Sequence, residues 1–496
     1  MSQAYLWLER TLIVQQPPID LGLVADPRAF LNTLGYTPGP TPGTIAPTYP
    51  PGLPLLMAGF LAVFGTWGPL LVVPASAALL VVATYALGRR LQSAPVGLAA
   101  AAFVAFSPVV IFKSLWPMSD VPAAAAWTLC LATALGTGRG APLTAGALAG
   151  LAILIRPNLA PLAIFGAMLL WQRDRSVPRG WMARLGLYAL AAAPFLSLVG
   201  WFNDHLYGSP FSSGYGDVRA LYSWGFIRPN LENYASWFLT SQGPFLAVLA
   251  LYGWARAFTD RSLRPLAFFT AAVVAAYLPY LVFDDWIWLR FLLPAYPALL
   301  VVTAAAAAAL LGRLTPWLRR SLTVAGLALV IGHSVWFTTS KEPFDLHAGE
   351  QRYAAIGGHV RAALPANAAF LTMQHSGSLR YYSGRLTARY DWLSAGHLAL
   401  GRAALEEAGY EVYVLVDEWE EADLRKRFTA PGEAAFLDAP PLIELVSSMR
   451  VRVYRLSDHE DPTAPATTYI ASGRGIPIPP VRRQAIAWEP LTHRTN

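Results

Sequence analysis

The sequence predicts an α-helical polytopic membrane protein of about ten transmembrane helices with a small C-terminal α/β extracytoplasmic domain. Three observations carry the prediction: 55% of the 496 residues are hydrophobic, 14% are charged, and the mean hydropathy is +0.40. Soluble domains carry about 25% charged residues, so a purely soluble globule is excluded, as are a disordered and a nucleic-acid-binding chain. The net charge of +7 comes mostly from Arg, which indicates a GC-rich genome more than an anionic partner. The single cysteine, Cys130, permits no intramolecular disulfide.

Ten apolar runs are candidates for the membrane-spanning helices. A spanning helix needs about 20 mostly apolar residues, and several runs are shorter, so flanking residues must contribute or the helix must be broken. The runs cover residues 69–87, 96–112, 121–135, 141–155, 159–171, 185–202, 244–254, 266–283, 291–311 and 322–336. A further apolar run, residues 52–64, is short and follows two prolines, so we expect an interfacial or re-entrant helix there.

Lys and Arg gather in alternate loops between these runs. One set of loops holds 13 basic residues and the other set holds 5. Cytoplasmic loops collect basic residues, so the first set is predicted to face the cytoplasm. Residues 1–50 are then the first extracytoplasmic loop, residues 51–340 form the transmembrane domain, and the chain after Ser340 lies outside.

The first 50 residues lack the basic and apolar regions of a signal peptide. Export of such a charged segment ordinarily requires a hydrophobic helix ahead of it. We therefore expect that the true gene starts upstream of Met1 and encodes a first helix. The alternative is that the segment is translocated together with the first helical hairpin.

From residue 341 to 457 the pattern changes to that of a soluble α/β domain. Strands that alternate with amphipathic or charged helices predict a small sheet with helices on its faces. The expected helices cover residues 351–364, 397–408 and 420–428, and the expected strands cover 368–373, 411–416 and a pair within 442–456. Residues 458–496, rich in Pro, Arg and Thr, are expected to form a loosely ordered tail.

Polar residues near the ends of the apolar spans are candidates for a functional site. An ionisable group at membrane depth costs free energy unless it is paired with another group or hydrated. Lys113 to Asp120 join two spans on the outer side. Ser119 or Asp120 could cap the helix that follows; the alternative is that Asp120 is a functional carboxylate at the membrane edge. Arg156-Pro157-Asn158 interrupts the stretch from 141 to 171. These side chains either satisfy carbonyls that Pro leaves free or hold a phosphate.

A third polar segment runs from Asp284 to Arg290. It is either an aromatic belt with a local Asp–Arg pair or it directs the Arg290 guanidinium at a lipid-linked phosphate, whose oxygens Arg matches bidentately. The aromatic and acidic loop 203–242 suits sugar or headgroup contacts, and equally a membrane-surface helix. His375 lacks a second ligand at metal-binding spacing, so no metal site and no cofactor are predicted.

A series of short motifs resembles the GT-C superfamily of integral-membrane glycosyltransferases. This superfamily includes protein O-mannosyltransferases, aminoarabinose transferases and a bacterial group with dolichyl-phosphate-mannose-mannosyltransferase-like domains. The similarity covers about residues 1–340 and rests on the order of motifs that are each weak alone. In order they are Tyr49-Pro50-Pro51-Gly52, Phe64-Gly65, Leu87-Gly88-Arg89-Arg90, Met118-Ser119-Asp120, Ala149-Gly150-Leu151 to Arg156-Pro157-Asn158, and Leu289-Arg290-Phe291-Leu292-Leu293-Pro294 with Pro297.

The resemblance implies an enzyme of the bacterial cytoplasmic (inner) membrane. It would move a sugar from a polyprenyl-phosphate donor to an acceptor glycan, lipid or protein on the outer face, in contact with membrane lipids and without nucleic acid. In the family, a carboxylate in the first outer loop, a few residues before a Tyr, acts as general base. Tyr5 would be that Tyr, so the acid is expected near or before Met1. Glu9, Asp20 and Asp26 lack the family's spacing.

The resemblance also assigns roles to residues of the spans. It implies Asp120 as a second, catalytic acid, and Arg290, Lys113 and Arg156 as ligands of the donor phosphate. The expected acceptor or sugar contacts are Asn158, Tyr5 and Asp217. Two other functions stay open: a transporter or lipid flippase, which would place charge near the midplane in paired repeats, and a degenerate, non-catalytic relative whose outer domain binds a partner.

Overall fold

The computed structural model describes residues 2–19, 30–173, 178–343, 346–447, 449–456 and 467–471. The chain divides into two compact units. The helical unit comprises residues 50–202 and 216–343. The α/β unit comprises residues 2–49, 203–215 and the chain from 344 onward. Residues 2–49 thus belong to the same unit as the C-terminal domain.

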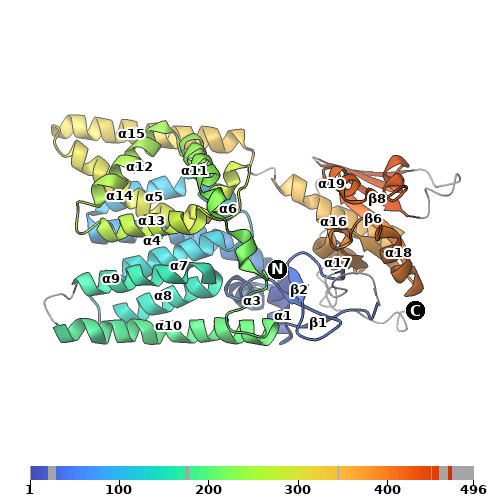
Figure 1. Ribbon diagram of the computed structural model, residues 1–496. Coiled ribbons are helices and arrows are strands. Elements are labelled where there is room, and N and C mark those ends of the chain that lie inside the picture. The colour runs from blue at the N-terminus through green and yellow to red at the C-terminus, as the bar shows by residue number, and fades with distance from the viewer. Residues whose placement is uncertain are drawn as a thin grey trace. The chain divides into compact units, whose positions relative to one another are not determined.

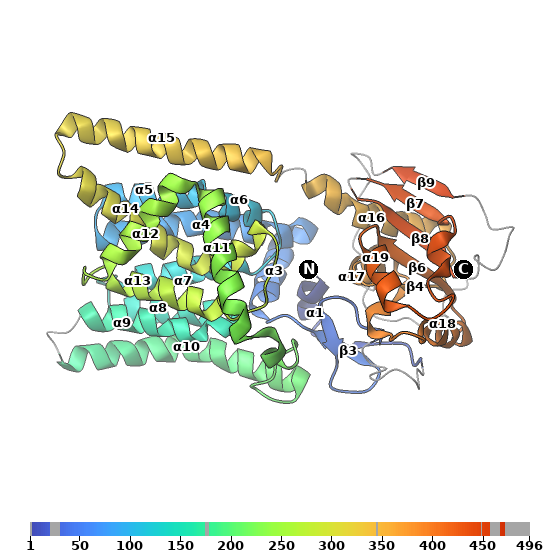
Figure 2. The same ribbon diagram turned by 45° about the horizontal axis from the view of Figure 1, so that its top comes forward.

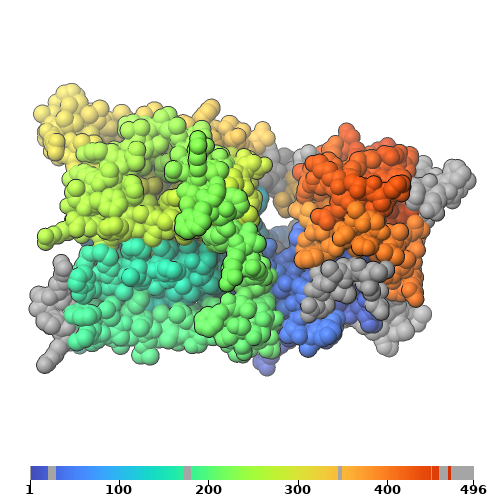
Figure 3. All heavy atoms as spheres, viewed as in Figure 1, coloured from blue at the N-terminus to red at the C-terminus, as the bar shows by residue number. Residues whose placement is uncertain are grey.

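The helical unit is a bundle of helices that pack side by side (Figure 1), and Figure 3 shows the heavy atoms of the same face as spheres. Each of the ten predicted runs contains helix. The elements are α3 (Gly52–Phe64), η1 (Gly65–Trp67), α4 (Gly68–Leu91), α5 (Ala94–Ala105), α6 (Pro108–Ser114), α7 (Asp120–Ala134), α8 (Ala141–Ile155), η2 (Pro157–Leu162), α9 (Ala163–Arg173), α10 (Pro178–Tyr207), η3 (Val218–Leu221), η4 (Trp224–Phe226), α11 (Ile227–Gln242), α12 (Pro244–Ala257), α13 (Arg264–Tyr277), η5 (Trp286–Ala295), α14 (Tyr296–Leu311) and α15 (Pro316–Ser340).

Four helical stretches among the described residues are long and apolar enough to cross a membrane, namely Gly52–Leu91, Gly180–Tyr207, Trp286–Leu311 and Pro316–Ser340. The pair α5 and α6, bent by 60°, makes a fifth if it forms one span. The polytopic helical fold class is confirmed, whereas the number of ten spans is not. Helices α8, α12 and α13 are apolar but shorter.

Prolines account for the breaks that shorten the predicted spans. Pro108 is the first residue of α6, where its missing N–H costs nothing and its fixed φ favours a new helix. The predicted run 96–112 is therefore two helices, and Lys113 lies in the last turn of the second. Pro157 likewise opens η2 directly after α8, so that Arg156 lies between two helices.

The α/β unit contains two sheets. A three-stranded antiparallel sheet, in the order β1-β3-β2, comes from the first 50 residues. A six-stranded mixed sheet, in the order β5-β4-β6-β8-β7-β9, forms the C-terminal domain (Figure 2). The elements are α1 (Ser2–Leu8), β1 (Val14–Gln15), β2 (Tyr36–Pro38), β3 (Thr44–Pro47), α16 (Leu346–Ala363), β4 (Ala368–Leu371), α17 (Ser376–Ser383), β5 (Leu386–Ala388), η6 (Tyr390–Trp392), α18 (Leu398–Glu407), β6 (Glu411–Asp417), α19 (Glu420–Arg427), η7 (Ala435–Asp438), β7 (Ile443–Val446), β8 (Val451–Arg455) and β9 (Thr468–Ala471).

The predicted small sheet is confirmed, and its first three strands run parallel. β4 pairs in parallel with both β5 and β6, so the carboxyl ends of these three strands meet at one edge. β8 is antiparallel to β6 and to β7. The sequence did not predict α17, β5 or β9. Apart from residues 467–471, which include β9, the predicted tail 458–496 lies outside the described residues.

Alternating side chains of the sheet build a core on each face. On β6, Tyr413 and Leu415 pack with residues of α16 and α17, whereas Val412, Val414 and Val416 pack on the other face with residues of α18 and α19. Alternation of this kind is what a strand covered on both sides requires. The core that contains Val412, Val414 and Val416 also contains the side chain of Phe30, which is fully buried. The N-terminal segment is therefore part of the folded domain, which its composition did not indicate.

Candidate functional site

Four of the predicted site residues converge within the helical unit. The Arg156 Nη1 atom lies 2.8 Å from Asp120 Oδ1, and the Arg290 Nη1 atom lies 3.9 Å from Asp120 Oδ2. Lys113 interacts electrostatically with both Asp120 and Arg290. These four residues, Lys113, Asp120, Arg156 and Arg290, are called the charge cluster below.

Three members of this cluster lie at helix ends, and Arg290 lies within η5. Asp120 is the first residue of α7, and Arg156 directly follows α8; these two helices pack against each other. Lys113 on α6 and Arg290 in η5 come together because η5 packs against both α6 and α7.

The Tyr-Pro-Pro-Gly motif supports the same region. A Cβ atom on Gly52 would lie 2.4 Å from the backbone nitrogen of Ile155, which is the residue before Arg156. Only glycine therefore allows the start of α3 to approach the last turn of α8 this closely. We infer that the motif fixes the point at which the Arg156 side chain leaves the backbone.

The alternative that Ser119 and Asp120 merely cap α7 is wrong. Ser119 occupies the N-cap position with helical dihedral angles, φ −77° and ψ −10°, and its side chain makes no capping hydrogen bond. The Asp120 carboxylate instead accepts a hydrogen bond from Arg156. The predicted local Asp–Arg pair is also wrong, because Asp285 accepts from the backbone N–H of Ile287 at the start of η5, and the carboxylate beside Arg290 is Asp120.

The charge cluster is buried and carries an excess of positive charge. The exposed fractions of the Asp120, Arg156 and Arg290 side chains are 4%, 12% and 14%, and Lys113 is 2% exposed. The cluster contains three formal cations and one carboxylate, and Asp285 also interacts electrostatically with Lys113. Buried charges are stable only when paired. In addition, Arg290 Nε is buried and has no hydrogen-bond partner among the described residues. The cluster is thus suited to an anionic ligand.

Aromatic rings surround the two guanidinium groups. The Arg290 guanidinium lies 4.4 Å from the ring centre of Trp288, and the Arg156 guanidinium lies 5.6 Å from that of Tyr277. Asn158, which the sequence also singled out, donates a hydrogen bond of 2.9 Å to the hydroxyl of Tyr277, the ring beside Arg156. Rings restrict the motion of the guanidinium groups and contribute cation–π attraction.

Two further predicted contacts have local surroundings of their own. Asp217 is exposed, and its side chain accepts a hydrogen bond of 3.0 Å from the backbone N–H of Arg219. This bond closes a local turn. Tyr5 is on α1 in the α/β unit beside Tyr381, and burial raises the pKa of its hydroxyl. Their roles as acceptor contacts stay predictions.

Of the three acids considered as substitutes for the family's first-loop base, one is described. Glu9 follows α1 and is exposed, whereas Asp20 and Asp26 lie outside the described residues. The aromatic loop 203–242 is largely helical, since α11 occupies its second half.

The sequence missed a buried polar network in the α/β unit. Asp417 ends β6, and its carboxylate lies 2.8 Å from His375 Nε2 and 3.3 Å from Arg352 Nη2. Burial alone would raise the pKa of the Asp417 carboxyl, but the hydrogen bonds and charges of His375 and Arg352 outweigh it and hold the pKa below its ordinary value. The sequence contained one sign of this network: Asp417 is an acidic residue at the end of an apolar strand.

This network yields a prediction about stability and pH. Asp417→Asn should destabilise the α/β unit by about 3 kcal/mol, because it leaves Arg352 buried without its anion. A carboxyl with a depressed folded-state pKa contributes stability above its unfolded pKa, and this contribution is lost as the pH falls through the folded pKa. Hydrogen exchange of β4 and β6 should therefore speed up in the wild type below about pH 4, and Asp417→Asn should lack that step.

The matched control is Glu406→Gln, which breaks the exposed pair of Glu406 with Arg402. It should leave hydrogen exchange in both strands unchanged. An Asp417→Asn protein with wild-type exchange at neutral pH would contradict the proposed contribution of the network.

Comparisons with known proteins agree with this architecture. Residues 48–201 match the model of the family described as dolichyl-phosphate-mannose-protein mannosyltransferase. The fold is similar to that of ArnT from Cupriavidus metallidurans bound to undecaprenyl phosphate, with a TM-score of 0.54 and 14% identity over 84% of this chain and 89% of that chain.

A second solved structure shares the fold. The archaeal oligosaccharyltransferase AglB from Archaeoglobus fulgidus, in complex with an inhibitory peptide and a dolichol-phosphate, matches with a TM-score of 0.51 and 12% identity over 85% of this chain and 69% of that chain. Among curated proteins, no sequence matches the chain. The family match over residues 48–201 and the shared fold confirm the resemblance to the GT-C superfamily that the motifs indicate.

Proposed function

We propose that the protein transfers a glycosyl group from a polyprenyl-phosphate sugar to an acceptor on the outer face of the cytoplasmic membrane. The observation that carries the proposal is the charge cluster, in which three largely buried cations lie around one carboxylate. The shared fold supports it, since two enzymes of that fold were solved with undecaprenyl phosphate and dolichol-phosphate.

An acceptor group that gives up its proton forms a new bond to the anomeric carbon. The bond between that carbon and an oxygen of the lipid phosphate breaks, so negative charge grows on the phosphate. Donors that are already oriented toward that charge stabilise the transition state without reorganisation. Arg290 and Arg156 supply guanidinium groups for this purpose, and Lys113 supplies an ammonium group. The unpartnered Nε of Arg290 is a donor that the phosphate would satisfy.

Asp120 acts in this proposal as a positioning residue. Its carboxylate is 2.8 Å from one guanidinium and 3.9 Å from the other. A carboxylate held by two cations is a poor acceptor for the proton of an acceptor hydroxyl, since the bound cations favour its charged form. We therefore assign general-base catalysis to none of the four cluster residues.

The proposed topology places the charge cluster at the outer ends of the spans and the α/β domain outside the cytoplasm of a bacterial cell. The Arg bias of alternate loops supports this arrangement. Protease added to intact spheroplasts should therefore remove the C-terminal domain, and inside-out vesicles should protect it. Full protection in spheroplasts would contradict the topology.

Reconstitution into liposomes tests the function. Undecaprenyl phosphate should bind saturably and undecaprenol, which lacks the phosphate, should not. Radiolabelled polyprenyl-phosphate sugars should then release free polyprenyl phosphate and pass the label to a membrane or envelope acceptor extract. Movement of an intact lipid across the bilayer without bond cleavage would identify a flippase instead, and binding with neither activity would identify a non-catalytic relative.

A further inference from the structure

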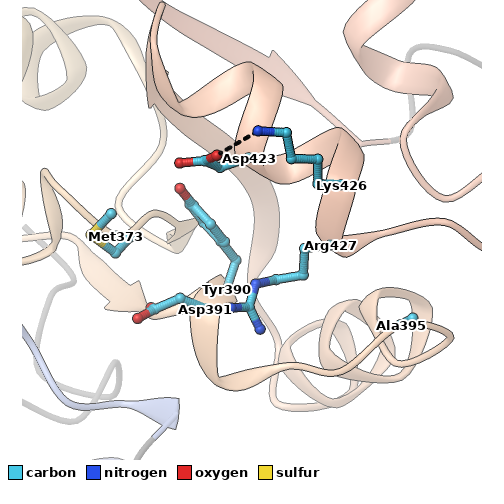
Figure 4. A pocket seen from close by; sticks show the side chains of 7 residues that line it. All are labelled: Met373, Tyr390, Asp391, Ala395, Asp423, Lys426 and Arg427. Atoms are coloured by element: carbon cyan, nitrogen blue, oxygen red, sulfur yellow. Dashed lines mark ion pairs between the residues drawn. The ribbon is translucent and has the colours of Figure 1, made fainter. Parts of the chain in front are cut away.

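The α/β unit contains a pocket that the proposed transfer reaction does not use. It has a volume of about 590 Å³. Its lining residues, shown in Figure 4, are Met373, Tyr390, Asp391, Ala395, Asp423, Lys426 and Arg427. This cavity is called the strand-end pocket below.

The position of the pocket in the sheet is that of a ligand site. Met373 follows β4, Tyr390 and Asp391 follow β5, and Asp423 lies on α19, which follows β6. All three parallel strands therefore contribute to the pocket from their carboxyl ends. Open α/β sheets bind their ligands in the crevice outside this edge.

A buried hydrogen-bond network fixes the position of Tyr390, one of the residues that line the pocket. Tyr390 is 3% exposed, and its hydroxyl donates a hydrogen bond of 2.7 Å to Glu420. The Glu420 carboxylate is fully buried and also accepts from the backbone N–H groups of Gln374 and Asp417. A buried carboxylate is costly unless it is fully hydrogen-bonded. This one joins the chain after β4, the end of β6 and Tyr390, so it keeps the pocket in one shape.

The polar groups of the pocket are balanced in charge and mixed in hydrogen-bonding character. Two negative and two positive formal charges line it: Asp423 and Asp391 supply acceptor oxygens, those of Asp391 also pairing with Arg389, and Lys426 and Arg427 supply donors. Asp423 and Lys426 form a loose pair of 3.7 Å, and both are largely exposed, which leaves them able to bond a ligand. Arg427 donates to the carbonyl of Leu393 and keeps further N–H groups.

This balance selects among ligand classes. An anion would face the Asp423 carboxylate, and a cation would face the Lys426 ammonium and the Arg427 guanidinium group. A neutral molecule with adjacent hydroxyl groups can donate to the carboxylates and accept from the cations at once. Met373, Ala395 and the Tyr390 ring add apolar surface for the C–H groups of such a molecule. Trp392, the residue after Asp391, is 46% exposed and extends the aromatic surface next to it in the chain.

We propose that the strand-end pocket binds a neutral sugar or a short neutral glycan. The inference goes beyond the proposed transfer reaction, because it assigns a second carbohydrate site to residues that the charge cluster does not include. The two sites lie in different units of the chain, so either can be lost while the other is kept.

The test uses the full-length protein in lipid nanodiscs. The probes are methyl glycosides of mannose, glucose and N-acetylglucosamine together with their neutral di- and trisaccharides, and glucuronate and glucosamine serve as charged counterparts. Titration calorimetry and saturation-transfer NMR should detect saturable binding of at least one neutral probe. The charged counterparts should bind at least about tenfold more weakly, because each meets a like charge in the pocket.

Two variants, one on α19 and one at the end of η7, separate the pocket from the general surface. Asp423→Asn removes the pocket carboxylate that pairs with Lys426, and Asp438→Asn breaks the exposed pair of Asp438 with Arg425 outside the pocket. Asp423→Asn should weaken the neutral probe at least about tenfold, the effect of one charge-assisted hydrogen bond. Asp438→Asn should leave the affinity unchanged.

Three results would overturn the proposal: no saturable binding of any neutral probe, tighter binding of a charged probe, or an equal loss in both variants. Hydrogen exchange of β4 and β6 reports whether each variant is folded, and a folded Asp423→Asn protein is expected because this side chain is 62% exposed. Both variants should keep wild-type binding of undecaprenyl phosphate. Failure of the sugar site is thereby distinguishable from failure of the proposed glycosyl transfer.

Discussion

Replacing Arg290 with alanine should reduce glycosyl transfer by at least about a hundredfold, the usual effect of losing one donor that faces developing charge. The side chain lies at 3.9 Å from Asp120, is 14% exposed and rests 4.4 Å from the Trp288 ring. Its Nε is a buried donor without a partner among the described residues. Each of these features is explained if a phosphate oxygen completes the site.

Turnover of a polyprenyl-phosphate sugar in proteoliposomes measures the effect, together with the affinity for undecaprenyl phosphate. Arg290→Lys should retain part of the activity, because an ammonium group keeps the charge and loses the planar pair of donors. The matched control is Arg228→Ala on α11, whose side chain is 89% exposed and pairs with Glu232. Wild-type turnover of the Arg290→Ala protein would exclude the assigned role.

The helices of the bundle could be predicted because their apolar runs are long relative to anything else in the chain. The run 141–155 coincides with α8, since Pro142 marks its start and Pro157 its end. The break within 96–112 was missed, although Ser107-Pro108 is a local signal for it. The strength of an apolar run hides such a break, because hydropathy does not record whether the backbone is continuous.

The individual residues of the charge cluster could be selected from the sequence, but not their mutual contacts. Each was noted because an ionisable group near a span needs a partner. The partners come from different helices, so Asp120 had a capping interpretation and Arg290 had a local pair with Asp285. Packing of α7 against α8 and η5 decides between these interpretations, and no local pattern contains that information.

The α/β unit shows the same division between local and long-range information. Strand β6 was evident from its β-branched residues. The burial of Phe30 in the C-terminal core and the contact of His375 with Asp417 were not. Both join segments that lie far apart in the chain, and a single sequence gives no sign of such pairs. The pocket at the carboxyl edge follows from strand order, which the sequence also leaves open.

Replacing Asp120 with asparagine should lower the turnover number at least about tenfold while the affinity for undecaprenyl phosphate is kept. Asn has the shape of Asp, and its amide oxygen can still accept the hydrogen bond from Arg156. The formal excess of positive charge in the cluster rises from two to three, which favours binding of a phosphate. The guanidinium groups of Arg156 and Arg290, however, lose the charge that holds them in place, and small errors in the position of catalytic groups are costly.

This split between binding and turnover separates two possible roles of Asp120. A general base would lose turnover together with the acidic limb of its pH profile. A positioning residue should lose turnover with the shape of the profile unchanged. Ser119→Ala is the matched control, because Ser119 makes no side-chain capping bond and its loss should alter neither quantity. If Asp120→Asn retains full turnover, the pair with Arg156 contributes only to the fold, and the donor phosphate must be held without it.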